Sequence, residues 1–210
     1  MRRAFPLILL LLASPLLSGA GQPVPEARPT FSSDQRTDLD KISAYLNAMH
    51  AVEGGFTQIG PNGDVDQGKI YIDKPGKVRF EYDAPNPTLV LSDGSSIYVQ
   101  NRKLNTVDRY PLAGTPLQLI LKGDTNLKQN TAILGIHQDG DSLIVDARTS
   151  TNRKKSNVTL VFARSPVELR QWTVIDDQGL STTVALRNTH PVPSLPDSLF
   201  KYAAAAPKSQ

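Results

Sequence analysis

The chain of 210 residues contains no cysteine, only three histidines, and few aromatic residues, which make up 6% of it. Without cysteine there is no disulfide, no thiolate metal site and no cysteine to carry a lipid anchor. His50, His137 and His190 stand alone, without the spacing of a metal site, so we expect solvated or capping histidines. We therefore expect no metal or other cofactor, and a stability that rests on an apolar core.

The N-terminus has the three parts of a secretory signal peptide. Arg2 and Arg3 form a basic start, residues 5–17 form an apolar run, and residues 18–20 supply the small side chains of a cleavage site. The run is too short for a comfortable membrane span, which favours a cleaved signal over the alternative, an uncleaved anchor. We expect removal of residues 1–20 and localisation in the periplasm.

Removal of the signal changes the charge of the chain. Residues 1–20 contain two arginines and no acidic residue, so 21 basic and 20 acidic residues remain. This balance, without a basic stripe of interleaved aromatic residues, argues against a nucleic-acid partner. The remaining length suits one domain with a sizeable core. We expect a flexible leader over residues 21–33, a single domain over 34–202 and a disordered tail over 203–210.

The first ordered element is expected to be an amphipathic helix that begins near Asp34. Ser33 or Thr37 is expected to cap it, and Gly54 and Gly55 are expected to end it. Its apolar residues recur at three- and four-residue spacing, the period of a helix. They are Leu39, Ile42, Leu46, Met49 and Val52.

After this helix the apolar pattern changes to a period of two, interrupted by turn pairs such as Asn62-Gly63 and Asp93-Gly94. About eleven short strands with short connections predict a mainly β fold, in which an antiparallel sheet curls into a barrel or half-barrel. The expected strands are 55–59, 67–73, 77–82, 88–92, 96–101, 103–109, 131–138, 142–148, 157–162, 169–176 and 181–189.

A short apolar helix is expected to interrupt the strands at residues 116–121. Thr115 can cap it and Pro116 occupies its first position. Such a helix must bury its apolar side chains, and the open end of a barrel is a natural place. Composition alone favours a barrel filled with side chains over one that holds a ligand cavity.

Motifs for catalysis and metal binding are weak. Asp64 and Asp66 lie in a loop that faintly resembles a calcium site but lacks the distal glutamate, so we interpret it as a polar hairpin loop. Ser95 and Ser96 lack the glycine frame of a nucleophile elbow, and no glycine-rich phosphate loop is present. The residues indicate a protein that is not an enzyme and does not hydrolyse nucleotides to power its work.

Four segments carry more specific motifs. They are Leu46-x-x-Met49-x-x-Val52-x-x-x-Phe56-Thr57-Gln58, the stretch from Gly68 to Tyr82 with Pro75 at its turn, the stretch from Pro87 to Gly94 followed by Ile97 and Tyr98, and the stretch from Thr115 to Leu121. In order and spacing these segments resemble the LolA family, the periplasmic carriers of outer-membrane lipoproteins in Gram-negative bacteria. The resemblance extends over roughly residues 38–189.

The resemblance implies an incomplete antiparallel barrel covered by an α-helical lid, with acyl chains held between them. It implies a monomeric carrier that receives acylated lipoproteins from an inner-membrane lipoprotein-releasing ABC transporter. Delivery would be to an outer-membrane acceptor lipoprotein, LolB-like where present. One alternative is a lipid-binding or envelope-sensing module of the same fold with a narrower ligand. A hydrolase or isomerase in a lipocalin-like barrel is another, and it requires a polar catalytic pair that the sequence does not show.

The resemblance also assigns residues to the site. Lys74 stands where the family usually has an arginine that ties the sheet to the lid, and a lysine lacks the planar fork of arginine. Gln118 and Val78 replace bulkier apolar residues, and the stretch from Pro193 to Tyr202 matches the family poorly. The residues expected to line an apolar cavity are Leu46, Met49, Val52, Phe56, Tyr71, Val78, Phe80, Leu117 and Ile120.

Overall fold

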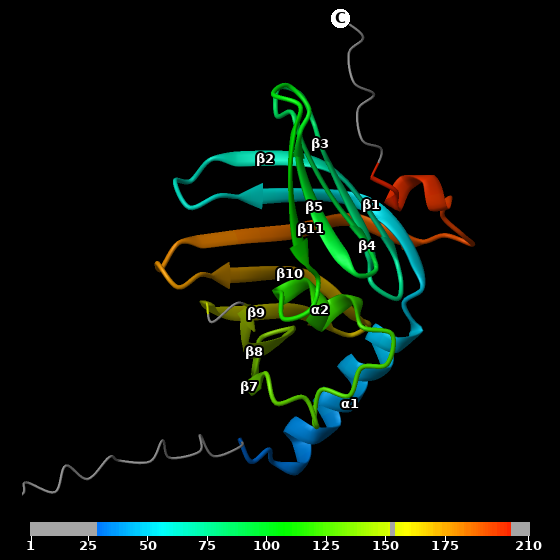
Figure 1. The fold of residues 1–210 in the computed structure, drawn as a ribbon. Coiled ribbons are helices and arrows are strands. Elements are labelled where there is room, and N and C mark those ends of the chain that lie inside the picture. Colours follow the sequence, from blue (N-terminus) through cyan, green and yellow to red (C-terminus); the bar gives the residue numbers. More distant parts are fainter. Residues whose placement is uncertain (1–28, 152–153, 203–210) are drawn as a thin grey trace, which may run out of the picture.

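One antiparallel sheet of eleven strands forms most of the structure, a computed structural model that describes residues 29–151 and 154–202 (Figure 1). The expected signal peptide, most of the expected leader and the expected tail lie outside the described residues. The helices are α1 (Ser33–Ala48), α2 (Pro116–Leu121) and the 3-10 helix η1 (Asp197–Phe200). The strands are β1 (Ala51–Ile59), β2 (Val65–Asp73), β3 (Lys77–Tyr82), β4 (Thr88–Asp93), β5 (Ser96–Asn101), β6 (Thr106–Pro111), β7 (Ile133–Asp139), β8 (Ser142–Thr151), β9 (Lys154–Arg164), β10 (Val167–Ile175) and β11 (Ser181–Pro191).

The sheet is open rather than closed. Its strands follow the order β6–β5–β4–β3–β2–β1–β11–β10–β9–β8–β7, so β6 and β7 are edges and only the β1–β11 pair joins strands far apart in the sequence. Beside the β7 edge lies α1, where Gln35 Nε2 donates a hydrogen bond to the carbonyl oxygen of Ile136 at 2.8 Å. The predicted fold class, a mainly β protein with an incomplete antiparallel barrel of about eleven strands, is confirmed.

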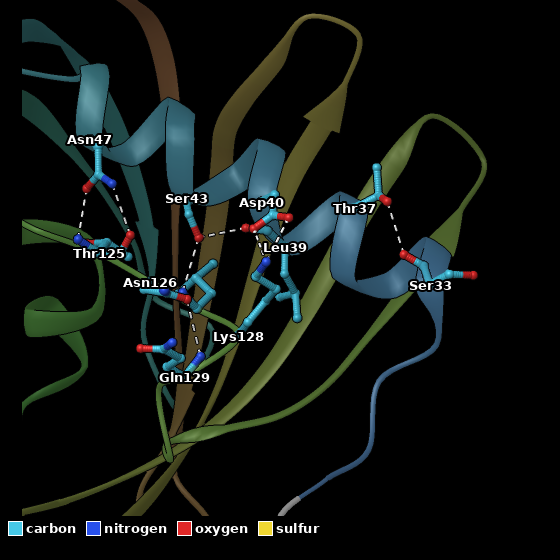
Figure 2. Close-up of polar contacts among 11 residues, drawn as sticks. Ser33, Thr37, Leu39, Asp40, Ser43, Asn47, Thr125, Asn126, Lys128 and Gln129 are labelled. Carbon is cyan, nitrogen blue, oxygen red and sulfur yellow. Dashed lines mark hydrogen bonds and ion pairs between the residues drawn. The ribbon is translucent and has the colours of Figure 1, made fainter.

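The first helix begins near Asp34 as predicted, but its cap and its end differ from the prediction. Ser32 caps it, in a reciprocal capping box with Gln35, whereas Thr37 donates from within the helix to the carbonyl of Ser33 (Figure 2). The helix ends at Ala48, and Val52 already lies in β1. There its backbone pairs with β2 and β11, and this pairing on both sides outweighs the helical period of the side chains.

The predicted bounds of β3 and β5 agree with the structure, whereas β6 begins three residues later than predicted. The Asn101 side chain accepts hydrogen bonds from the backbone of Lys103 and Leu104, and Asn105 has a φ of 55°. These features make residues 102–105 a turn. At the start of α2 the Thr115 hydroxyl donates to the carbonyl of Leu112, at 2.7 Å, instead of capping the helix.

The C-terminal stretch from Pro193 to Tyr202 packs on the outer face of the sheet. Phe200 of η1 is 2% exposed, and the neighbouring β4 residues Leu89 and Leu91 are buried outside the main core. Lys77 forms an ion pair with Asp197 at 2.8 Å, which holds η1 on β3.

Within residues 29–151 and 154–202, no helix has the length and apolar character needed to cross a membrane. The same residues contain no group of three or more histidine, aspartate or glutamate side chains arranged to hold a metal ion.

Candidate functional site

The inner face of the sheet and the two helices enclose one cluster of buried apolar side chains, which we call the apolar interior. Because strand residues alternate between two faces, every second residue of the central strands points into it. From the helices and the segment between α2 and β7 come Leu39, Ile42, Leu46, Met49, Leu119, Ile120, Leu121 and Leu127. From the sheet and its loops come Phe56, Ile70, Ile72, Val78, Phe80, Ile97, Leu112, Ile133, Ile136, Leu143, Val145, Ala147, Val158, Leu160, Phe162, Leu169, Trp172 and Val184.

Eight of the nine residues expected to line a cavity lie in or against this interior. Six of them are buried members of the cluster: Leu46, Met49, Phe56, Val78, Phe80 and Ile120. The other two, Val52 and Leu117, are partly buried and pack against it.

Tyr71 is the exception, because it does not lie in the expected cavity. Its neighbours Ile70 and Ile72 point inward, so alternation along β2 directs Tyr71 to the outer face. There it lines a hollow together with Glu53 and Lys69. The match to the family motif assigned Tyr71 to the cavity, whereas the alternation of residues along β2 directs its side chain to the outer face.

Four aromatic rings meet edge to face within or against the apolar interior. The ring of Phe56 lies 5.3 Å from that of Phe80 and 5.0 Å from that of Tyr82, and Phe80 lies 6.2 Å from Trp172. Gly68 makes room for this group, because a Cβ there would lie 2.8 Å from the Phe56 ring. Sequence reasoning did not single out Trp172. A β-bulge between Leu169 and Gln171 shifts the alternation of β10, so that both Leu169 and Trp172 point inward, which a simple period of two does not predict.

The hydroxyl of Tyr82 marks the polar border of the aromatic group. It donates a hydrogen bond to Gln58 Oε1 at 2.7 Å. Burial raises the pKa of Tyr82 to about 12, so the hydroxyl remains a neutral donor over the physiological range. This end of the interior is therefore apolar apart from one satisfied hydroxyl.

A cover formed by α1, α2 and residues 122–131, which we call the lid, lies over the apolar interior. Figure 2 shows how α1 is bound to the segment after α2. Asn47 Nδ2 donates to the backbone oxygen of Thr125 at 3.0 Å, and its Oδ1 accepts from the backbone nitrogen of Thr125 at 2.8 Å. One amide therefore satisfies both backbone groups of a buried residue.

Two further residues on the same side of α1 continue these contacts (Figure 2). The hydroxyl of Ser43 accepts a hydrogen bond from the backbone nitrogen of Leu127 at 3.1 Å. Asp40 forms an ion pair with Lys128 at 2.7 Å. Because residues 40, 43 and 47 are three and four positions apart, they lie on one helix face and bind the segment as a row. The lid is thus one connected body.

The turn between β2 and β3, residues 74–76, contacts the C-terminal ends of both lid helices. Lys74 Nζ donates a hydrogen bond to the backbone carbonyl of Leu46 in α1. The backbone nitrogen of Gly76 donates to the carbonyl of Leu121 in α2 at 2.9 Å. The φ of Gly76 is 78°, and a Cβ at this position would lie 2.7 Å from the backbone of Gly94 in the β4–β5 turn. Both the backbone conformation and the close approach to that turn therefore require glycine at position 76.

The electrostatics of this turn are unusual. Lys74 is partly buried, and burial lowers the pKa of its ammonium to about 8. A buried ammonium is disfavoured because it loses hydration. An arginine at this position would stay charged at any pH the protein meets, whereas Lys74 can lose its charge at mildly alkaline pH.

A groove of about 350 Å³ opens beside the C-terminal end of α1. Tyr45, Met49 and Val52 line it together with Glu168 and His190. Met49 belongs to the apolar interior and Val52 packs against it, so the groove adjoins the interior. The arrangement suits the binding of an apolar chain, because aliphatic and aromatic side chains make contacts without directional bonds.

Comparisons with known proteins show what the chain is similar to. A family model described as outer membrane lipoprotein carrier protein LolA matches residues 47–203. An outer-membrane lipoprotein carrier protein of Dechloromonas aromatica is 28% identical over 177 residues, which cover 80% of this chain and 84% of the relative. The corresponding protein of Cupriavidus pinatubonensis is 23% identical, covering 78% and 82%. The crystal structure of LolA superfamily protein NE2245 from Nitrosomonas europaea matches with a TM-score of 0.44 and 10% identity, covering 80% of this chain and 97% of that one.

Proposed function

Because the chain belongs to the LolA family of outer membrane lipoprotein carrier proteins, we propose that it carries lipoproteins across the periplasm. The acyl chains of the cargo bind in the apolar interior, between the sheet and the lid. The protein acts as a binding protein and not as an enzyme. Its cargo comes from an inner-membrane ABC transporter and passes to an outer-membrane acceptor.

One observation carries this proposal: an apolar interior lies under a lid that polar contacts hold at its border. The side chains of the interior are aliphatic or aromatic, and the lid contributes Leu119, Ile120 and Leu121 to it. A lid that separates from the sheet would expose apolar surface on both sides. Acyl chains that enter between the lid and the sheet cover this surface again and so keep it away from water.

The energetics explain why such a carrier needs partners. Burial of a lipid chain contributes about 0.8 kcal/mol per methylene, so one chain of about 15 methylenes costs roughly 12 kcal/mol to expose to water. The carrier offsets this cost by enclosing the chain, while the free energy for extraction comes from the transporter. Contacts without directional bonds allow later release to an acceptor.

The turn of residues 74–76 acts as the latch of this lid. It binds α1 through Lys74 and α2 through Gly76. Opening therefore breaks these two hydrogen bonds and the two that join α1 to β7, Gln35 to Ile136 and Gln138 to Asp38. The bonds between α1 and residues 125–128 keep the lid together. A two-position lid of this kind binds in one state and releases in the other.

Purification from the periplasm of a native host depleted of the outer-membrane acceptor tests the proposal. Mass spectrometry of the purified protein is expected to find bound triacylated lipoprotein. Leu117→Glu, which places a charge at the border of the interior, is expected to reduce the bound amount. Leu134→Glu is the control, because Leu134 is 40% exposed on the edge strand β7.

Two results of this experiment contradict the proposal. Protein that is empty under acceptor depletion, in an otherwise functional host, contradicts lipoprotein binding. Recovery with a polypeptide regulator and without acyl chains identifies the alternative, an envelope-sensing module of the same fold.

A further inference from the structure

A polar crevice of about 620 Å³ lies between α2, residues 124–132 and the end of β8. It differs from the apolar interior in chemistry, because amides, hydroxyls and a few charged groups line it. The charged residues of the lining are Lys122, Asp124 and Arg148, so most of the lining is neutral and positive charge exceeds negative charge by one. The proposed binding of acyl chains does not use this crevice.

The polar crevice and the apolar interior share a wall. Leu119 lines the crevice and is also a buried member of the interior, and Ala132 lines the crevice while packing against the interior. Thr149 continues the inward-facing row of β8 that begins with Val145 and Ala147, and it brings this row into the crevice. A ligand with an apolar part in the interior could therefore extend a polar part into the crevice.

Three amides in the crevice are oriented by their own oxygens. Gln118 Oε1 accepts from the backbone nitrogen of Gly114 at 2.8 Å, and Asn130 Oδ1 accepts from that of Ala132 at 3.0 Å. Asn126 Oδ1 accepts from the backbone nitrogen of Gln129 at 3.3 Å (Figure 2).

These bonds show which end of each side-chain amide is the oxygen, because a backbone nitrogen can only donate a hydrogen bond. The three amide nitrogens remain as donors, with no protein acceptor among residues 29–151 and 154–202. The crevice thus presents neutral donors, one from α2 and two from the segment that follows it.

We propose that the polar crevice binds the extended, hydrophilic peptide segment that follows the acylated N-terminal residue of a cargo lipoprotein. An extended peptide offers one carbonyl acceptor per residue, which matches neutral amide donors and needs no particular sequence. This inference rests on the proposed function, because the acyl chains must occupy the interior for the peptide to reach the crevice.

Two synthetic probes test the inference. The first is a triacylated cysteine methyl ester, and the second is the same cysteine followed by about eight glycine and serine residues, long enough to cross the crevice. The fluorescence of Trp172, the only tryptophan of the chain, reports on binding in the interior. The peptide tail is expected to lower the Kd roughly tenfold, since each net hydrogen bond contributes a few-fold in affinity.

The variant that removes the donors is the triple substitution Gln118→Glu, Asn126→Asp and Asn130→Asp. Each new carboxylate keeps the oxygen that accepts from the loop backbone, so the loop is expected to stay folded, which circular dichroism and thermal unfolding check. The donors become acceptors that repel peptide carbonyls. The control for the change in charge is the triple substitution Asn62→Asp, Gln178→Glu and Asn188→Asp, at exposed positions outside the crevice.

In the triple variant the tail is expected to give no gain in affinity, while the control keeps the gain and both proteins bind the tail-free probe normally. If the tail adds nothing in the unmodified protein, or if its gain survives the triple substitution, the crevice is not the peptide site. If the triple variant weakens binding of a lysophospholipid as much as that of the tailed probe, the crevice is a headgroup site and the inference is wrong. Failure of both acylated probes to bind overturns the proposed function itself.

Discussion

Lys74 donates a hydrogen bond from its side-chain nitrogen to the backbone carbonyl of Leu46, a residue 28 positions earlier in the chain. The bond connects the β2–β3 turn to the end of α1, where helix carbonyls have no partner within the helix. Its donor is partly buried, so the contact combines a favourable hydrogen bond with the cost of burying a charge. This balance makes the contact suitable for a lid that must open.

Substitution Lys74→Leu is expected to speed release of a bound acyl chain. Leucine cannot donate, so the Leu46 carbonyl loses its partner at a cost of about 1–3 kcal/mol, part of which is offset because no charge is buried. We expect release of a fluorescent fatty acid to accelerate several-fold in stopped-flow measurements. Lys69→Leu, on an exposed β2 side chain, serves as the control. An unchanged release rate in Lys74→Leu would show that this residue is not the latch.

The pH is expected to change the stability and the rate of release through Lys74. The pKa of Lys74 is about 8 in the folded protein, below the usual value of 10.5. Between these two values the unfolded chain binds more protons than the folded one, so the stability due to Lys74 rises with pH over this window. A neutral amine still donates to the Leu46 carbonyl without the cost of burying a charge.

Release of the fluorescent fatty acid from the unmodified protein is therefore expected to slow as the pH rises through about 8. The free energy of unfolding, measured with urea, should rise relative to that of Lys74→Leu between about pH 8 and pH 10.5. In Lys74→Leu the release rate should not show this pH dependence. Faster release at higher pH would contradict the assigned cause.

Asn47→Ala is expected to loosen the lid. It leaves the backbone nitrogen and oxygen of the buried Thr125 without their partner, which costs about 2 kcal/mol. Hydrogen exchange should show faster exchange in residues 125–128, and urea denaturation should show the loss of stability. Gln178→Ala is the matched control, and equal exchange in the two variants would show that Asn47 does not hold the segment.

Gly68→Ala is expected to destabilise the sheet by about 1–3 kcal/mol, as overpacking of a tight site does. A Cβ at this position would overlap the backbone oxygen of Glu81 and crowd the Phe56 ring at 2.8 Å. Gly135→Ala is the control, because a Cβ there meets nothing within 4 Å. Urea denaturation should separate the two variants, and similar midpoints would show that Gly68 is not a packing requirement.

The sequence predicted most strands because their signals are local. Alternation between turn pairs reproduced the bounds of β3 and β5, where burial pattern and turn chemistry agree. The end of α1 was placed too late because Val52 keeps the helical spacing of apolar residues. Its pairing with Ile72 of the following strand and with Pro191 of the distant β11 depends on other strands, so a local period does not reveal it.

The residues of the site show the same division. Leu46, Phe56 and Phe80 were expected at the interior on the evidence of motifs, and the structure brings them together. Tyr71 was placed on the wrong face although Ile70 and Ile72 beside it carried the correct period. The partner of Lys74 was not predictable, because a backbone carbonyl has no residue type that marks it.

The sequence by itself determined the class of the fold, the number of strands and the apolar character of the interior, because period, turn residues and composition are properties of neighbouring residues. Only the tertiary structure decided which strands remain edges, which end of each helix meets the β2–β3 turn, and that a polar crevice shares a wall with the interior. These features depend on backbone groups and on residues far apart in the chain. Their contacts form only when the sheet curves around the lid and brings residue 74 to the end of α1.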